Sequence, residues 1–177
     1  MKKSALIKNF SSRKGFTLIE LLIVITIIGA LAVTIFVALN PAQRLKDARS
    51  ARRTTDVDTI LTAIHTAIVD NKGSYPTNMP ASTEVRQLGT GATGCALALT
   101  GNCTTTGASS DVCADLTADV AIDLLPYLKS MPIDPTKGVT YTAAKTGYTV
   151  VRDANGIVTV TACGSETSPF VPESASR

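Results

Sequence analysis

The sequence predicts an α+β protein in which a long N-terminal helix packs on a small antiparallel sheet of three strands. The residues from Leu21 to Leu39 carry no charge, and nineteen helical residues span about 28 Å, enough to cross a bilayer core. Apolar residues then recur at helical spacing as far as Ile68. Short segments rich in Val, Thr, Tyr and Ile follow near the C-terminal end, as is typical of strands.

We divide the 177 residues into six segments: a basic leader (1–15), a transmembrane or assembly helix (16–40), an amphipathic helix (41–73), a loop region with short helices and disulfides (74–137), an antiparallel sheet (138–163) and a flexible tail (164–177). The leader contains five basic residues and no acid, which leaves 12 basic and 14 acidic residues in the rest of the chain. This balance, with 5% aromatic residues and no tryptophan, gives no support to nucleic-acid binding.

One carboxylate, Glu20, lies within the first turns of the apolar helix. A charge inside an apolar span costs about 2.5–3.5 kcal/mol at its centre and less near its ends, so we expect Glu20 to have a positive partner. The chain supplies that partner only if it is cut before Phe16, which creates a new α-amino group. A competing site for a conventional signal peptidase follows Ala32, although apolar residues continue beyond it.

The amphipathic helix is predicted to begin at Asn40-Pro41, an N-cap followed by proline, and to stop at Lys72-Gly73. We interpret its basic run, Arg44–Arg53, as a solvated face or a set of inter-subunit ion pairs, and give less weight to lipid or DNA. The single histidine, His65, is interpreted as a partly exposed helix residue. The apolar face consists of Val57, Ile60, Leu61, Ile64 and Ile68.

Four cysteines lie beyond the apolar span, and none forms a CxxC pair. They predict two disulfides in an oxidising compartment, with buried free thiols as the alternative. Three connectivities are open, and we favour a short loop among the first three cysteines with the remaining one joined to the fourth. The candidates are Cys95, Cys103, Cys113 and Cys163.

The C-terminal part is predicted to contain two short helices and three strands. Asn155-Gly156 is a strong hairpin signal between the last two strands. The helices are Thr83–Leu88 and a second from Asp115 or Thr117 to Leu125; the strands are Val139–Thr142, Tyr148–Arg152 and Ile157–Cys163. No hydrolase triad, metal cluster or nucleotide loop can be assembled, so we predict no catalytic residue, no metal, no cofactor and no enzymatic activity.

Gly15-Phe16-Thr17-Leu18-Ile19-Glu20 resembles the processing site of type IV pilins and of the pseudopilins of type II secretion. The resemblance covers Arg13 to Leu39. It implies that a prepilin peptidase cuts after Gly15, that Phe16 is N-methylated, and that Glu20 helps to dock the subunit into a helical filament of identical copies. An inner-membrane assembly platform with its ATPase, and membrane lipid before assembly, are the other implied partners.

The implied location is the cytoplasmic membrane, crossed once with the N-terminus inside, and then an extracellular pilus or a periplasmic pseudopilus. The chain departs from many relatives because the first proline after the proposed cut, Pro41, comes about four residues later. Met131-Pro132-Ile133-Asp134-Pro135 resembles the step into the sheet of these proteins, and with only Asp134 and distant Asp123 it gives calcium binding little support. A pseudopilin and a membrane-tethered binding domain, uncut or cut after Ala32, are the alternatives to a pilus subunit.

Overall fold

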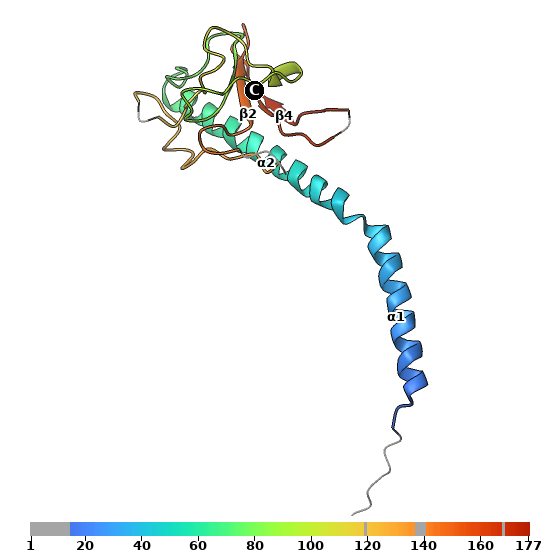
Figure 1. Cartoon of the computed structure of the whole chain (residues 1–177). Helices are drawn as coiled ribbons and strands as arrows, with labels where there is room; N and C mark the ends of the chain where they lie inside the picture. Colours follow the sequence, from blue (N-terminus) through green and yellow to red (C-terminus); the bar gives the residue numbers. More distant parts are fainter. Residues whose placement is uncertain (1–14, 119, 137–140, 168) are drawn as a thin grey trace, which may run out of the picture. The chain divides into compact units, whose positions relative to one another are not determined.

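The computed structural model describes residues 15–118, 120–136, 141–167 and 169–177. The chain divides into two compact units, Met1–Arg44 and Leu45–Arg177. Helix α1 (Leu18–Leu39) lies in the first unit, and most of helix α2 (Pro41–Asp70) lies in the second, together with the sheet (Figure 1). The predicted leader, apart from Gly15, lies outside the described residues.

Helix α1 buries none of its residues. The two hydroxyl groups in it are bonded within the helix: Thr26 donates to the carbonyl of Ile23 at 2.8 Å, and Thr34 donates to the carbonyl of Leu31 at 2.8 Å. A helix in hydrocarbon must satisfy its polar groups internally, because no water is there to do so. The local bonding of α1 therefore suits an apolar environment on every side.

A single residue, Asn40, separates α1 from α2. Its backbone is left-handed, with φ 40° and ψ 72°, a conformation that asparagine tolerates better than most residues. Its carbonyl accepts the amides of Gln43 and Arg44 at 3.0 and 3.3 Å, while Pro41 has no amide that needs a partner. The break thus falls at the expected Asn40-Pro41 pair. The sequence predicts Asn40 as the N-cap of the second helix. In the structure it is the C-cap of α1 with a left-handed backbone, because this one residue has to end α1 before α2 begins.

Helix α2 packs one apolar face into the core of the second unit. Val57, Ile60, Leu61, Ile64 and Ala67 are all buried on this face. The helix ends where expected: the amides of Lys72 and Gly73 donate to the carbonyls of Val69 and Ile68 at 3.2 and 2.8 Å. This pair of bonds is typical of a Schellman motif, in which the left-handed residue, here Lys72 at φ 57°, follows the last turn and free carbonyls of that turn are satisfied.

The sheet has four strands and not the predicted three. Its order is β1 (Val85–Gln87), β2 (Tyr148–Arg152), β3 (Val158–Ala162) and β4 (Ser174–Ser176), and all neighbours are antiparallel. Buried residues of β2 and β3 pack against α2, which supplies the cover that so small a sheet needs. The cluster includes Tyr148, Val150, Val158 and Val160.

The expected hairpin joins β2 to β3. The carbonyl of Asp153 accepts the amide of Gly156 at 3.2 Å, and the amide of Asp153 donates to the carbonyl of Ile157 at 2.9 Å. With Gly156 at φ 87°, this is a three-residue loop of the type I plus bulge class. The Asp153 carboxylate adds two bonds, from the amides of Asn155 and Ile157.

Both short helices predicted in the loop region are wrong. Thr83–Leu88 contains strand β1, in which Val85 and Gln87 are buried on either side of Arg86. The described residues between Asp115 and Leu125 form turns; residue 119 lies outside them. The Asp115 carboxylate accepts the amide and the hydroxyl of Thr117, and local bonds of this kind compete with a helix.

The other two differences concern the ends of the sheet. The tail 164–177, expected to be flexible, contains β4, whose Ala175 pairs with Val160 of β3. The predicted strand Val139–Thr142 lies partly outside the described residues, and its Thr142 forms an isolated bridge with Lys145. The sheet therefore recruits one strand from the loop region and one from the tail.

Candidate processing and assembly site

The N-terminal end of α1 is closed by a reciprocal pair of side-chain hydrogen bonds. Thr17 is the N-cap, with an extended backbone at φ −83° and ψ 151°. Its hydroxyl oxygen accepts the amide of Glu20 at 3.3 Å, and the Glu20 carboxylate accepts the Thr17 amide at 2.9 Å. The Thr17 hydroxyl also donates to that carboxylate at 2.9 Å. This arrangement is a capping box, which satisfies two backbone donors of the first turn.

The capping box changes the expectation for Glu20. Before any cut, its carboxylate already accepts two hydrogen bonds from Thr17, and a negative group at a helix N-terminus is favoured by the helix dipole. Within the described part of the chain Glu20 forms no ion pair. Its negative charge is therefore hydrogen-bonded by Thr17 but not neutralised by a positive group. The uncut chain thus already hydrogen-bonds the Glu20 carboxylate, and the positive partner expected for it stays a prediction.

The residues just before the helix are exposed. Gly15, Phe16 and Thr17 are non-helical, and the side chain of Phe16 is 89% exposed. A Cβ placed on Gly15 would meet no atom of the described residues within 4 Å. Packing against the described part of the chain therefore does not require glycine at position 15.

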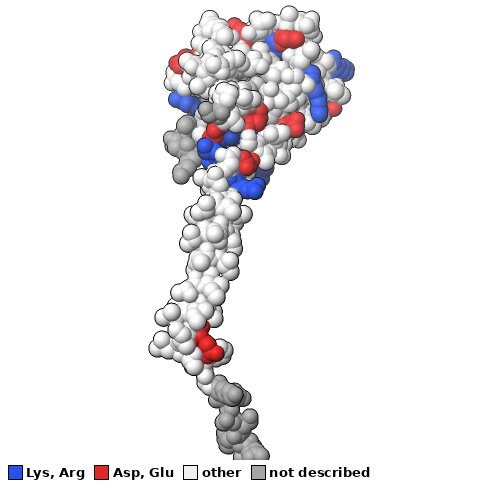
Figure 2. Space-filling model, turned by 90° about the vertical axis from the view of Figure 1, so that its right-hand side faces the viewer, with Lys and Arg blue, Asp and Glu red and all other residues white. Residues whose placement is uncertain are grey.

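The surface of α1 is apolar around its whole circumference. Figure 2 shows it as uncharged except for one acidic group, which the sequence identifies as Glu20. Among the described residues, the helical run Leu18–Asp70 contains the one stretch long and apolar enough to cross a membrane, and none of that stretch is buried. The apolar part of this run is α1, all of whose residues are exposed.

Most of the basic residues between Arg44 and Arg53 form ion pairs with acidic residues of the second unit. The Arg53 guanidinium, almost fully buried, donates to Asp134 at 3.0 Å and to the hydroxyl of Thr136 at 3.0 Å. Arg49 forms an ion pair with Glu166 at 2.5 Å. The interpretation of Arg44–Arg53 as a solvated or inter-subunit face is therefore wrong for these two arginines, whose partners lie in segments far along the sequence.

Asp56 connects the same helix to the sheet. Its carboxylate accepts the hydroxyl of Tyr148 at 2.8 Å and forms an ion pair with Arg52 at 3.5 Å. Burial and the hydrogen bond to Asp56 raise the pKa of Tyr148 far above its usual value. His65, by contrast, is half-buried on α2, and its Nε2 has no hydrogen-bond partner among the described residues.

Two disulfides staple the loop region. Cys95 is joined to Cys113, and Cys103 is joined to Cys163 at the end of β3. The second bond holds the short helix η1 (Gly101–Cys103) beside the sheet, where Thr149 of β2 also donates to the carbonyl of Asn102 at 2.7 Å. No group of three or more potential metal ligands occurs among the described residues.

These features define a class of protein: an apolar, uncovered helix with a capped carboxylate in its first turn precedes a disulfide-stapled α+β domain. Residues 10–36 match the prokaryotic N-terminal methylation motif, and the chain thus carries the signal of type IV pilins and pseudopilins. No curated protein and no solved structure matches the chain at a significant level.

The structure places Gly15, Phe16 and Glu20 together at the start of α1, and the four cysteines in the other unit. Sequence reasoning missed Thr17, although threonine followed three residues later by glutamate before an apolar run is the signature of a capping box. It also missed the Arg53–Asp134 pair. No local pattern announces a pair whose members are 81 residues apart.

Proposed function

We propose that the chain is a prepilin-like structural subunit. It is cut after Gly15, N-methylated on Phe16 and polymerised through α1 into a helical filament. The observation that carries the proposal is the coincidence of the methylation motif with a helix that has no covered face. Such a helix needs lipid before assembly and the same helix of other copies afterwards.

The assembly step rests on packing more than on a gain of hydrophobic burial. Lipid tails are as apolar as the side chains of α1, so helices associate through close van der Waals contact and interhelical hydrogen bonds. Gly29 supports close approach, because no atom lies within 4 Å of the position its Cβ would occupy. The filament core then receives α1 in surroundings about as apolar as those it leaves.

Glu20 supplies direction to this packing. Its carboxylate keeps the two Thr17 bonds and, in the assembled state, pairs with the α-amino group of Phe16 in a neighbouring copy. That pairing requires the cut, because Phe16 has no free amino group in the precursor. The docking role of Glu20 is thus coupled to processing, while Thr17 keeps the carboxylate hydrogen-bonded beforehand.

Recognition by the peptidase accounts for glycine at position 15 in this proposal. Packing against the described residues does not call for glycine there, which supports a requirement set by the peptidase that accepts the non-helical segment Gly15–Thr17. Gly15→Val is expected to leave the two folded units unchanged and to block the cut. The matched control for cleavage is Gly29→Val, which changes a glycine of α1 that is remote from the cut; its filament yield is not part of the control, because Gly29 also supports helix packing.

The decisive measurement is the N-terminal residue of the mature protein by mass spectrometry of material isolated from its native cells. We expect N-methylated Phe16 for the natural chain and the unprocessed leader for Gly15→Val. A mature chain that begins at Val33 or Met1 contradicts the proposal and favours a membrane-tethered binding domain.

A pseudopilin of a secretion or DNA-uptake machine is the second candidate, and the same motif supports it. Both candidates share the cut, the methylation and helical packing; they differ in the length and location of the fibre. Electron microscopy of intact cells separates them: long surface fibres that label with an antibody to the second unit favour a pilus, and fibres confined to the periplasm favour a pseudopilus.

A further inference from the structure

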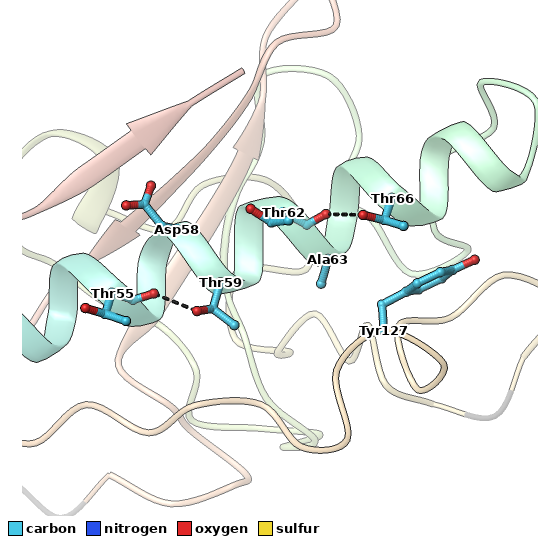
Figure 3. A pocket seen from close by; sticks show the side chains of 7 residues that line it. All are labelled: Thr55, Asp58, Thr59, Thr62, Ala63, Thr66 and Tyr127. Carbon is cyan, nitrogen blue, oxygen red and sulfur yellow. Dashed lines mark hydrogen bonds between the residues drawn. The ribbon is translucent and has the colours of Figure 1, made fainter.

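A shallow groove lies beside α2 on the face that carries a row of threonines (Figure 3). The threonines are spaced three or four residues apart, which places them on one side of the helix. The groove has a volume of about 570 Å³ and lies wholly within the second unit. Its lining residues are Thr55, Asp58, Thr59, Thr62, Ala63, Thr66 and Tyr127.

The groove presents mainly hydrogen-bond acceptors. The hydroxyls of Thr59 and Thr66 each donate to the carbonyl four residues earlier at 2.8 Å, and Thr55 does the same at 3.2 Å. The Tyr127 hydroxyl donates to Asp70 at 2.7 Å, a bond that raises the pKa of Tyr127 above its usual value. Each of these oxygens has therefore used its proton and retains only lone pairs for an incoming group.

The charge of the groove is negative. Asp58 is exposed and forms no ion pair or hydrogen bond through its side chain within the described ranges. Ala63 forms a small apolar floor between the threonines. A complementary partner thus brings a cation, hydrogen-bond donors and one apolar side chain.

The beginning of α2 offers this combination. Leu45 is 60% exposed and lies in sequence between Arg44 and Lys46, whose side chains form no ion pair in the part of the chain that the structure describes. The later arginines of the basic run are occupied within the second unit: Arg49 by Glu166, Arg52 by Asp56 and Arg53 by Asp134.

These groups cannot meet within one chain. Lys46 and Asp58 are twelve residues apart on the same helix, which corresponds to about 18 Å along its axis. An ion pair needs about 4 Å between the charged atoms. The unpaired cations and the acceptor groove therefore fit each other only between two copies.

We propose that the groove on α2 is an interface that receives the first turns of α2 from a second copy. Lys46 lies near Asp58, and Leu45 packs on Ala63 and the threonine methyl groups. The proposal rests on the proposed function, because it needs copies held side by side in a filament. It adds a second, polar contact to the apolar packing of α1.

Cysteine cross-linking in the full chain tests the contact directly. We expect Leu45→Cys combined with Thr62→Cys to yield dimers and larger multimers after mild oxidation of cells that assemble the protein. Each single variant, and the matched pair Leu45→Cys with Ser109→Cys, should stay monomeric on a non-reducing gel. Ser109 is exposed but lies in the disulfide-bounded loop. Filaments that form without the multimer ladder, or an equal ladder from the control pair, overturn the proposal.

Charge exchange tests its chemistry. Lys46→Glu and Asp58→Lys are each expected to lower the filament yield about tenfold, because each places like charges together across the interface. The double variant restores the attraction and is expected to recover the yield. Both positions are exposed, so thermal unfolding followed by circular dichroism should be the same in all variants. A double variant no better than the single ones overturns the interface.

The same samples separate the two proposals. Mass spectrometry of the N-terminus reports processing, and electron microscopy reports filaments. A natural chain that is neither cut nor assembled removes the proposed function and this interface together. Cut chains that form filaments irrespective of the charges at positions 46 and 58 remove the interface alone.

Discussion

Thr17 is the residue that reconciles a carboxylate with an apolar segment. It donates both its amide and its hydroxyl to one oxygen of Glu20, Oε2, at the start of α1. The amino group that the proposed cleavage creates would then add a positive partner to a carboxylate that is already hydrogen-bonded. A carboxylate has about four lone-pair sites, and Thr17 uses two of them. The Glu20 carboxylate can therefore still accept a hydrogen bond from an amino group.

Replacing Thr17 tests this role. Thr17→Val keeps the shape of the side chain and removes the hydroxyl, and loss of an N-cap typically costs about 1 kcal/mol. We expect cleavage after Gly15 to continue and the filament yield to fall about fivefold, with Thr17→Ser close to the natural chain. Quantitative electron microscopy, with mass spectrometry of the N-terminus, provides the measurement. Equal yields from the valine and serine variants contradict the role.

Arg53 and Asp134 form a pair that matters because it is buried. Removing one member leaves a charge without a partner in the interior, which costs about 3–5 kcal/mol. We therefore expect Arg53→Met to lower the free energy of unfolding by that amount, measured by urea denaturation of the full chain in detergent. Arg53→Met combined with Asp134→Leu removes both charges and should recover most of the loss; failure to recover it would falsify the assignment.

Tyr148 makes stability depend on pH at the alkaline end. Its pKa is raised by burial and by the bond to Asp56, so the neutral hydroxyl is favoured in the folded state. The contribution is fully present below the unfolded pKa of about 10 and is lost as the pH rises above it. Denaturation between pH 8 and pH 11 should show a steeper loss of stability for the natural chain than for Tyr148→Phe, which has no proton to release.

At the scale of elements, the two disulfides close loops of different size. The pairs are separated by 18 and 60 residues. In the chain-entropy model, removing the shorter loop costs about 3 kcal/mol and removing the longer about 4 kcal/mol. We compare two double variants, Cys95→Ala with Cys113→Ala and Cys103→Ala with Cys163→Ala. Calorimetry should give the lower melting temperature for the second of them. The reverse order shows that local packing, not loop length, dominates.

The elements that sequence reasoning identified are those with a strong local signal. The apolar run, the periodicity of α2 and Asn155-Gly156 each mark a structure formed by neighbours in sequence. Strand β4 has the sequence Ser-Ala-Ser, which has no preference for strands, and it forms because β3 offers an edge to pair with. Strand β1 is likewise three residues long and set by its partner β2.

The candidate sites also differ in how much of them the sequence predicts. Gly15, Phe16 and Glu20 are contiguous with the apolar run, so their pattern is visible in one short segment. The groove on α2 is not, because Tyr127 reaches it from a distant turn, and the proton balance of its threonines is set by hydrogen bonds that a sequence does not display. Two ion pairs of the basic run, Arg49–Glu166 and Arg53–Asp134, are also long-range.

At the scale of the whole molecule, the proposed processing would change the sign of the net charge. The full sequence has a formal charge of +3 and an isoelectric point near 8.7. A cut after Gly15 would remove five basic residues and no acid, which would leave 12 basic and 14 acidic residues. Isoelectric focusing of the purified protein should therefore place the mature chain below pH 7 and Gly15→Val near 8.7. A mature chain that focuses with the precursor contradicts the cut.

The apolar side chains of α1 are exposed on all sides of the helix, and this limits how one chain can leave the membrane. Each large apolar side chain left in water forgoes about 1.5–3 kcal/mol, and α1 carries a full helix of them. Release into the aqueous phase is thus closed to an individual molecule on any useful timescale. Under the proposed function, transfer from the bilayer to the filament is therefore direct: the growing end of the filament contacts the membrane and binds α1 before α1 leaves the lipid.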